Sequence, residues 1–204
     1  MIAIVDYGAG NIHSVVNVLK SFSIDFCLTE NPEKLLQADG IILPGVGAFG
    51  DAAKNLESLG LSGGIIDATK KGVPLLGICL GLQLLFETSE ESKGAKGLSL
   101  IKGGVTLLKA EGRKIPHIGW TSLSGVRGRL LEGIKDDEYF YFVHSYGAHA
   151  TERSLVAATA SYGESFDACI EKDNIFGCQF HPEKSSTMGR KIIENFLKIC
   201  GEEI

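Results

Sequence analysis

Short apolar runs and amphipathic stretches alternate along the first half of the chain. The runs at 2–5, 26–28, 40–43 and 74–78 are typical of strands buried on both faces of a sheet. Between these runs, apolar residues recur with the spacing of a helix. We expect helices from an N-cap at Asn11 to about residue 22, and at 51–59, 64–71 and 79–86. This order predicts an α/β fold with a mostly parallel, twisted sheet and helices on both faces.

The pattern changes in the second half, where glycine and proline interrupt shorter apolar runs. Residues 89–97 are polar and contain glycine, which predicts a loop. Residues 98–124 predict short strands that extend the sheet with antiparallel pairs. Residues 139–142 are four consecutive aromatics, more typical of a core strand than of a site. Further strands are expected at 155–159, 169–171 and 175–180, and a closing helix at 188–200.

The composition favours a small-molecule enzyme over a nucleic-acid or membrane protein. With 204 residues, 44% of them hydrophobic, the chain can build one sizeable core, so we expect a single domain over residues 1–204. A net charge of -5 offers no basic surface for nucleic acid or for an anionic membrane.

Cysteine usage and the N-terminal sequence bear on the compartment. The five cysteines are odd in number and never occur in C-x-x-C spacing, which argues against a disulfide framework and a zinc site. The first residues lack a basic leader, and no apolar run approaches the ~20 residues that span a bilayer. We therefore expect a cytoplasmic protein without a bound metal or membrane association.

The motif Gly77-x-Cys79-x-Gly81 lies where a predicted strand passes into a predicted helix. This spacing is typical of an elbow in which a nucleophile occupies a strained turn and glycines let neighbouring backbone pass closely. The unpaired N–H groups of a helix N-terminus also favour a thiolate over a thiol. Cys79 is therefore a candidate nucleophile. The alternative, on this motif alone, is an inert cysteine in the core.

A second glycine-rich turn, Pro44-Gly45-Val46-Gly47, follows another predicted strand. Turns at that end of an open α/β sheet commonly line a ligand crevice, because their unpaired N–H groups bind an anion or oxyanion. An ordinary tight turn is the alternative. No Gly-Lys-Ser/Thr follows, and Gly8-x-Gly10 lacks the third glycine of a dinucleotide fingerprint, so we expect no nucleotide cofactor.

His181 and Glu183 flank Pro182 after the last predicted strand. Proline pushes the preceding residue toward extended geometry, in which residues two apart face the same way. A carboxylate beside an imidazole holds its tautomer and stabilises the imidazolium, which is the orienting role in a catalytic triad. An ordinary turn is the alternative for this segment alone. Taken with the elbow motif, a triad of Cys79, His181 and Glu183 is favoured.

These three motifs, in this order and spacing, resemble those of the class I, triad-type glutamine amidotransferases, and the resemblance covers nearly the whole chain. It implies a flavodoxin-like α/β fold and glutaminase activity without a cofactor. Cys79 would attack the side-chain amide carbon of L-glutamine, with His181 as base and then acid and Glu183 as its orienter. A γ-glutamyl thioester would form, ammonia would leave, and water would then release L-glutamate.

The same resemblance implies roles for residues around the triad. Backbone N–H groups that stabilise the oxyanion would come from Leu80 and from the turn Gly45, Val46 and Gly47. The substrate glutamine would be held by Gln83, Glu91 and the backbone around Ser145 and Tyr146.

Four further segments, 4–11, 45–51, 116–120 and 141–146, resemble the branch of this family that supplies ammonia for histidine biosynthesis. In that branch the ammonia passes to a (β/α)₈-barrel cyclase subunit within a heterodimer. The positions expected to face this partner are Asn11, Trp120, Tyr141 and Lys184. Thr121 stands where the family more often has asparagine, which puts one local interface contact in doubt.

Two other interpretations stay open on the sequence. Another amidotransferase glutaminase, or a γ-glutamyl hydrolase, would share Cys79 and His181 but not residues 116–120, and product formation with each candidate partner separates these. A non-catalytic α/β binding or scaffold protein would carry a vestigial triad. The presence of all three triad residues argues against that interpretation.

Overall fold

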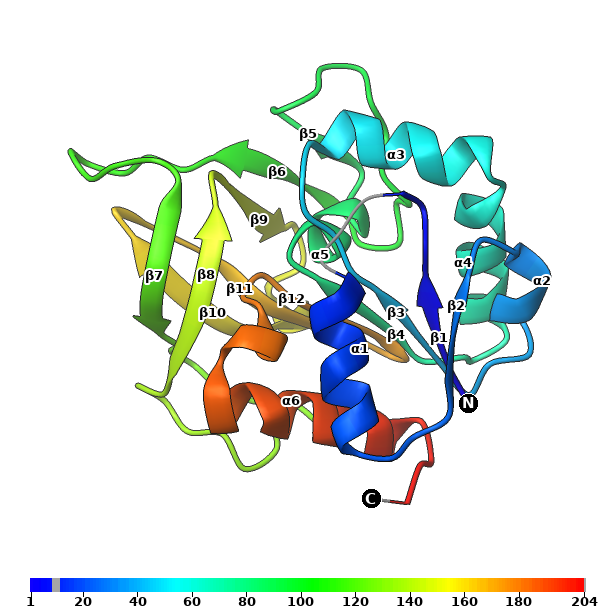
Figure 1. The fold of residues 1–204 in the computed structure, drawn as a ribbon. Helices are drawn as coiled ribbons and strands as arrows, with labels where there is room; N and C mark the ends of the chain where they lie inside the picture. Colours follow the sequence, from blue (N-terminus) through cyan, green and yellow to red (C-terminus); the bar gives the residue numbers. More distant parts are fainter. Residues whose placement is uncertain (9–11, 204) are drawn as a thin grey trace.

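A ten-stranded mixed sheet runs through the computed structural model, which describes residues 1–8 and 12–203 (Figure 1). The strand order is β2-β1-β3-β4-β12-β11-β9-β6-β5, with β10 paired to β11. The neighbours from β2 to β12 pair in parallel, which confirms the predicted mostly parallel sheet. These five strands are β2 (Phe26–Thr29), β1 (Ile2–Val5), β3 (Gly40–Leu43), β4 (Leu75–Ile78) and β12 (Ile175–Cys178).

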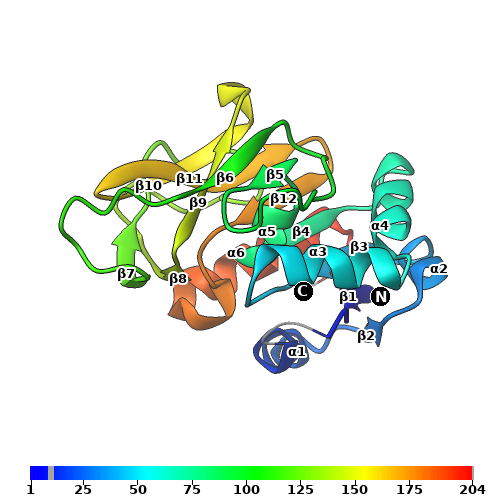
Figure 2. The ribbon, with the colours of Figure 1, turned by 90° about the horizontal axis from the view of Figure 1, so that it is seen from above.

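Helices cover both faces of the parallel strands (Figures 1 and 2), as predicted. Ile2 and Ile4 of β1 pack in one apolar cluster with α1 and α6, whereas Ala3 and Val5 pack in a second cluster with α3 and α4. This is the period-two alternation of a strand buried on both sides. The helices are α1 (Ile12–Ser21), α2 (Pro32–Leu35), α3 (Phe49–Ser58), α4 (Leu61–Lys70), α5 (Leu80–Leu84) and α6 (Ser186–Ile199).

Antiparallel pairs extend the sheet beyond β12, as the sequence predicts. β11 (Glu164–Lys172) pairs with β12 and with β10 (Val156–Tyr162). The sheet continues through β9 (Tyr146–Ala150) and β6 (Gly103–Leu107), and it ends at β5 (Thr88–Ser89), which is parallel to β6.

The strands predicted at 155–159 and 169–171 belong to a longer hairpin. β10 and β11 pair from Val156 opposite Ile170 to Tyr162 opposite Glu164, with Gly163 at the turn. Near the turn the strands carry polar and partly exposed side chains. The apolar signal therefore stops several residues before the backbone ladder does.

One part of the antiparallel prediction is wrong. β7 (His117–Ser122) does not extend the main sheet but pairs with β8 (Tyr139–His144) in a separate two-stranded sheet (Figure 1). In β8 the aromatic residues alternate, so that Phe140 and Phe142 are fully buried while Tyr139 is 58% exposed. The aromatic run therefore supplies a core face and an outer face, because successive strand side chains point to opposite sides.

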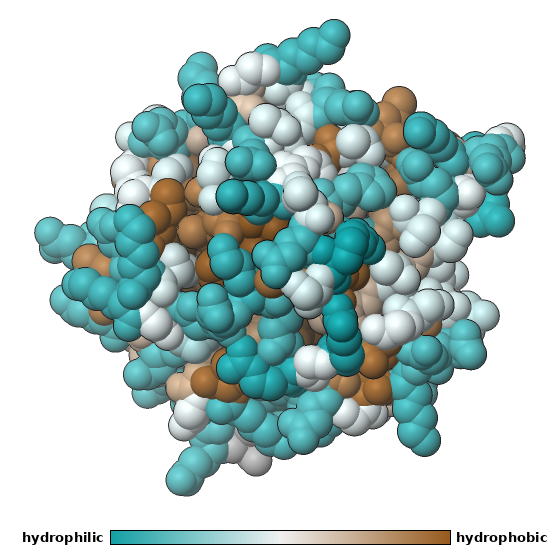
Figure 3. All heavy atoms as spheres, turned by 180° about the vertical axis from the view of Figure 1, so that it is seen from behind, coloured by the Kyte–Doolittle hydropathy of each residue, from teal (hydrophilic) through white to brown (hydrophobic). Residues whose placement is uncertain are grey.

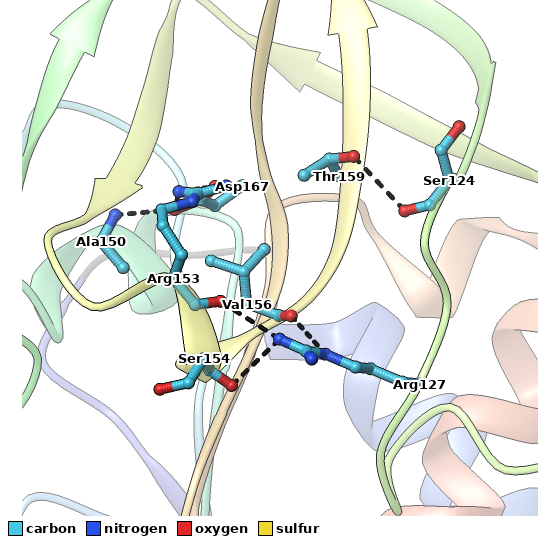
Figure 4. Close-up of polar contacts among 8 residues, drawn as sticks. All are labelled: Ser124, Arg127, Ala150, Arg153, Ser154, Val156, Thr159 and Asp167. Carbon is cyan, nitrogen blue, oxygen red and sulfur yellow. Dashed lines mark hydrogen bonds and ion pairs between the residues drawn. The ribbon is translucent and has the colours of Figure 1, made fainter.

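The β7–β8 sheet is tied to the main sheet at β10. Ser124, just after β7, and Thr159 of β10 exchange two backbone hydrogen bonds of 2.9 Å, and the Thr159 hydroxyl also donates to the Ser124 carbonyl (Figure 4). His117 of β7 stacks on Tyr162 of β10, with ring centroids 4.1 Å apart. These contacts hold the small sheet in a fixed place.

Two arginines secure the connection between β9 and β10 (Figure 4). Arg153 donates to both carboxylate oxygens of the buried Asp167, at 2.7 and 2.9 Å, and Asp167 also accepts the N–H of Ala150. Arg127 donates to three carbonyl groups within residues 153–156. Since an unpaired buried carboxylate is costly, these bonds fix the course of the chain around β9.

Polar side chains cover most of the surface seen from behind, and hydrophobic ones are exposed in separate areas among them (Figure 3). Large exposed hydrophobic side chains include Ile118, Trp120 and Tyr139, which all belong to the β7–β8 sheet. None of the helices within residues 1–8 and 12–203 is long and apolar enough to cross a membrane.

Candidate active site

Cys79 lies at the turn between β4 and α5, where the elbow motif predicts it. Its backbone has φ 54° and ψ -107°, a conformation that residues other than glycine rarely adopt. Both glycines of the motif are required by packing. A Cβ on Gly81 would lie 1.8 Å from the carbonyl oxygen of Leu43, and one on Gly77 would lie 2.6 Å from the carbonyl oxygen of Gly81. The elbow thus presents one thiol at the carboxyl edge of the parallel strands.

His181 and Glu183 meet at the same edge. Because β12 pairs in parallel with β4, with Cys178 opposite Ile78, the segments that follow the two strands emerge side by side. His181 Nδ1 lies 2.8 Å from Glu183 Oε1, and the ring also contacts the thiol of Cys79. The second carboxylate oxygen, Glu183 Oε2, is buried and has no hydrogen-bond partner among the described residues.

The backbone conformation that brings Glu183 to His181 differs from the extended one predicted from the sequence. His181 is extended, with φ -97° and ψ 96°, but Pro182–Lys184 is a short 3₁₀ helix rather than a continued strand. Proline is favoured in the first turn of a helix, because its fixed φ suits the turn. The turn, not strand alternation, brings the Glu183 carboxylate back to the ring.

The surroundings of His181 favour its protonated form. Burial lowers the pKa of the ring, but hydrogen bonds to Cys79 and Glu183, together with their charges, outweigh burial and raise the pKa to about 10. A ring that holds a proton this firmly is a good acceptor for the proton of a thiol. The three side chains therefore have the arrangement of nucleophile, base and orienting carboxylate.

The position of Cys79 at a cavity distinguishes it from three other cysteines. Cys169 and Cys178 lie opposite each other in β11 and β12, where burial raises the pKa of both thiols well above the usual value. Burial also raises the pKa of Cys200 to about 12. Thiols of this kind are poor nucleophiles at neutral pH. Cys79 is the cysteine that lines a cavity beside a histidine.

That cavity, about 270 Å³ in volume, opens between the elbow and the junction of β8 and β9. The carboxylate of Glu91 stands at it and accepts the N–H of Phe49 at 2.7 Å. All four residues predicted to bind glutamine line the cavity, together with the nucleophile, the histidine and part of the predicted oxyanion hole. They are Gln83, Glu91, Ser145, Tyr146, Cys79, His181, Leu80, Val46 and Gly47.

The predicted oxyanion residues are brought together, but their N–H groups do not converge. The N–H of Leu80 donates to the carbonyl oxygen of Gly45 at 3.4 Å. Since the C=O and N–H of a trans peptide point in opposite directions, the N–H of Val46 faces away from Leu80. An oxyanion hole needs donors aimed at one point. In this conformation the hole is therefore not assembled.

Gln179 belongs to the site, although no role was predicted for it from the sequence. Its fully buried side chain donates to Cys79 Sγ at 3.6 Å and accepts from Gln83 Nε2 at 3.1 Å. Gln83 also donates to the carbonyl oxygen of Tyr146 at 3.0 Å. The sequence signal that could have found Gln179 is an amide near the end of the apolar run 175–180, because a buried polar side chain needs a hydrogen-bond partner.

The described residues predicted to face a partner lie in two places. Trp120, 49% exposed, and Tyr141, partly buried, are neighbours on the outer face of the β7–β8 sheet, with ring centroids 5.9 Å apart. Lys184 is exposed at the cavity beside Cys79. Asn11 lies outside the described residues.

Two buried histidines outside the triad were not predicted to have a role. His117 and His144 are directly opposite in the β7–β8 pair, and His117 Nδ1 lies 3.0 Å from His144 Nε2. The Thr121 hydroxyl lies 2.9 Å from His117 Nε2, so this departure from the family pattern is bonded within the chain. A histidine in each of two predicted strands was visible in the sequence, but the register that pairs them was not.

No cluster of three or more His, Cys, Asp or Glu side chains suited to a metal ion occurs in residues 1–8 and 12–203. Side-chain groups of the residues that line the cavity include a thiol, two imidazoles, an amide, the carboxylate of Glu91 and the amine of Lys184. These groups suit attack on a polar carbonyl compound.

Comparisons with known proteins agree on one family. Residues 3–200 match the family "Glutamine amidotransferase class-I". The protein "Imidazole glycerol phosphate synthase subunit HisH" is similar over the full length in three organisms. The identity is 48% in Desulfitobacterium hafniense strain Y51 (100% of this chain, 96% of the relative), 49% in Methanocaldococcus jannaschii (98% and 100%) and 46% in Bacillus subtilis (100% and 98%).

Solved structures share the fold at low sequence identity. "Crystal structure of glutamine amidotransferase" superimposes with a TM-score of 0.79 at 19% identity, covering 99% of this chain and 100% of that one. "Structure of PurLQS from Thermotoga maritima" gives a TM-score of 0.76 at 20% identity, with 97% of each chain covered. At these identities the likeness concerns the fold alone.

Proposed function

This chain belongs to the class-I glutamine amidotransferase family, and on that premise we propose that it is the glutaminase subunit of an imidazole glycerol-phosphate synthase. In this role it hydrolyses L-glutamine to L-glutamate and ammonia for histidine biosynthesis. The observation that carries the proposal is the His181–Glu183 pair beside Cys79 at a cavity of about 270 Å³. We propose that residues 1–204 form one amidotransferase domain. The unpaired cysteines support work in a reducing cytoplasm.

The chemistry follows from the three side chains. His181 accepts the proton of the Cys79 thiol, and the sulfur attacks the side-chain amide carbon of glutamine. As the carbon–nitrogen bond breaks, His181 returns the proton to the leaving nitrogen, so that ammonia departs and a γ-glutamyl thioester remains. Water, activated by the same ring, then cleaves the thioester, releases glutamate and restores the thiol. Glu183 holds the ring and offsets its positive charge.

The Gly45–Val46 peptide is the element that we propose to limit this reaction in the free chain. Its carbonyl faces Leu80, where the developing oxyanion needs N–H donors. This peptide turns through ψ of Gly45 and φ of Val46, and a glycine at the first of these positions lowers the steric cost of the rotation. Rotation of this one peptide would turn the Val46 N–H toward Leu80 and free the Leu80 N–H. A low resting rate avoids wasting glutamine when no acceptor is ready.

We further propose that a cyclase subunit with a (β/α)₈-barrel fold is the acceptor and forms a heterodimer with this chain. The outer face of the β7–β8 sheet supports this, because Ile118, Trp120 and Tyr139 are exposed there beside Tyr141. Large aromatic side chains dominate the energetics of protein interfaces. The cyclase would use the ammonia to make imidazole glycerol phosphate.

Isotope transfer tests this function. The chain is mixed with the cyclase subunit, its nucleotide substrate and L-glutamine labelled with ¹⁵N at the amide, in the presence of excess unlabelled ammonium. We expect ¹⁵N in the imidazole product together with release of glutamate. Product without ¹⁵N would contradict direct transfer of ammonia, and absence of glutamate would contradict glutaminase activity.

A further inference from the structure

His117 and His144 form a buried pair at one end of the β7–β8 sheet, where His144 lines the cavity. The exposed fraction is 2% for His117 and 6% for His144. His117 stacks between Phe142 and Tyr162, with ring centroids 5.2 and 4.1 Å away. His144 packs edge-on against Phe166 at 4.8 Å. This aromatic packing fixes both rings, so each ring nitrogen must find its partner within the protein.

The partners determine where each proton lies. His144 Nδ1 is 2.8 Å from the carbonyl oxygen of Tyr146, which can only accept, so Nδ1 carries a proton and donates. In a neutral ring Nε2 is then an acceptor, and it receives the Nδ1–H of His117 at 3.0 Å. His117 Nε2 is in turn an acceptor, and it receives the hydroxyl proton of Thr121 at 2.9 Å. All these donations run in one direction, from Thr121 to Tyr146.

The surroundings keep both rings neutral, as this assignment requires. Burial lowers the pKa of His117 to about 4, and the positive charge of Arg113 adds to the effect. Burial likewise lowers the pKa of His144 to about 3, against the opposing effect of its bond to Tyr146. At neutral pH each ring therefore has one donor and one acceptor.

The series of hydrogen bonds continues into the active site. The Tyr146 carbonyl accepts from His144 and, at 3.0 Å, from Gln83 Nε2. Gln83 donates also to Gln179, and Gln179 donates to the sulfur of Cys79. A continuous set of buried and partly buried hydrogen bonds thus joins the strand that carries Trp120 to the nucleophile.

We propose that His117 and His144 are positioning residues for glutamine: held by Thr121, the pair fixes the Tyr146 carbonyl and, through it, the amide of Gln83 at the cavity. The expected effect on glutamine kinetics rests on the proposed glutaminase function. The proton positions rest on the geometry alone. Without the pair, the Ser145–Tyr146 backbone loses one of the donors that anchor it at the cavity wall, and Gln83 is left as the other side-chain donor to the Tyr146 carbonyl. Glutamine binding then weakens, and the chemistry at Cys79 is changed less.

Nitrogen NMR of the histidine rings tests the geometry without any assay of activity. In the ¹⁵N-labelled full chain at pH 7, we expect both rings to be neutral with the proton on Nδ1. Signals showing the proton on Nε2 of His144, or a charged ring at either position, would overturn the proposal.

Kinetics of the chain in complex with the cyclase subunit test the consequence. His144→Phe removes both ring nitrogens, whereas His144→Asn keeps an N–H close to the position of Nδ1. We expect the phenylalanine variant to raise KM for glutamine about tenfold, the worth of one hydrogen bond, with kcat changed less than about threefold. The asparagine variant should stay within about threefold of the wild-type KM. A wild-type KM in the phenylalanine variant would overturn the proposal.

A second pair of variants covers the case in which the phenylalanine variant does not fold. Thr121→Val removes the hydroxyl at nearly constant shape, and Thr121→Ser keeps it. We expect KM to rise about threefold with valine only, and equal KM values for the two would overturn the proposal. Absence of glutamate release by the wild-type complex would contradict the proposed function. The NMR spectra would still decide whether the protons of His117 and His144 lie on Nδ1.

Discussion

At the scale of single residues, the two oxygens of Glu183 have different environments. Oε1 accepts from His181, while Oε2 is buried and has no partner among the described residues. Glu183→Gln keeps an oxygen for the ring but loses the charge that stabilises the imidazolium, and its NH₂ group needs a partner at the Oε2 position. We expect about a 10²-fold loss of kcat for glutamine hydrolysis.

His181→Ala should cost as much as Cys79→Ala, on the order of 10⁴-fold or more, because nucleophile and base act as one unit. The measurement is glutamate release by each variant in the complex, with circular dichroism to confirm the fold. Equal, near-complete loss in Glu183→Gln and His181→Ala would indicate a direct chemical role for the carboxylate.

The His117–His144 pair predicts how stability depends on pH. Burial depresses both folded-state pKa values, to about 4 and about 3. A depressed pKa contributes stability that is present above the unfolded value of about 6.5 and is lost as pH falls toward the folded value. His181 adds no slope below about pH 5.5, because its raised pKa keeps the folded ring protonated and the unfolded ring is protonated there too.

Between pH 6.5 and about 4, each buried histidine should therefore lower the free energy of unfolding by up to about 1.4 kcal/mol per pH unit. Urea titrations of the wild type and of His144→Asn over this range measure the slope. We expect a shallower slope in the variant, because one titrating group has been removed. An unchanged slope would show that His144 does not titrate as its surroundings require.

How far the sequence predicts the site also differs from residue to residue. Cys79 could be found because an elbow leaves a short local motif, and His181 because Pro182 follows it. Gln179 and His144 could not be assigned a role from the sequence, because their partners lie 100 and 27 positions away in the chain. Such contacts depend on strand order and register, which local patterns do not specify.

At the scale of elements, close packing at the elbow between β4 and α5 should make the protein's stability sensitive to substitution of Gly81. A methyl group on Gly81 would lie 1.8 Å from the Leu43 carbonyl oxygen, and backbone there cannot move without disturbing β3. Gly81→Ala should therefore lower the free energy of unfolding by about 3 kcal/mol or more. Gly63→Ala is the control, because a Cβ on this α4 glycine meets nothing within 4 Å.

The control should gain up to about 1 kcal/mol, since alanine favours a helix interior. Equilibrium unfolding in urea of both variants is the measurement. A Gly81→Ala variant as stable as wild type would mean that the elbow does not pack as closely as described.

Strands and helices that are deeply buried were predicted from the sequence more accurately than half-exposed ones. Strands such as β1 and β3 are buried on both faces and read as continuous apolar runs. α3 and α4 were found but begin two or three residues earlier than predicted. β7 was placed in the wrong sheet, because pairing partners of half-exposed strands are decided by tertiary contacts such as the Ser124–Thr159 bridge.

At the scale of the whole molecule, the free chain should be a poor glutaminase that its partner activates. The N–H of Leu80 donates to the Gly45 carbonyl, and we expect docking of the partner to favour the other orientation of this peptide. A 10²-fold activation would need only about 2.7 kcal/mol of differential binding. Trp120→Ala should reduce this activation, because the ring is exposed on the face of the β7–β8 sheet where we propose that the partner docks.

The measurement is glutamate release at saturating glutamine, for the free chain and for the complex with cyclase and nucleotide. Leu59→Ala is the matched control, since it removes an exposed apolar side chain at the end of α3, outside the β7–β8 sheet. Full activity in the free chain would show that the orientation of the Gly45–Val46 peptide does not limit the reaction. Equal effects of the two substitutions would remove Trp120 from the interface.

The variant Cys79→Ala tests most directly whether Cys79 releases ammonia from glutamine for a second subunit. Cys79→Ala is combined with the cyclase subunit and its nucleotide, and formation of the imidazole product is followed with glutamine or with ammonium salt at alkaline pH, where free ammonia is abundant. We expect no product from glutamine and normal product from ammonium, because only the thiol is missing. Product formation from glutamine by this variant would contradict the account.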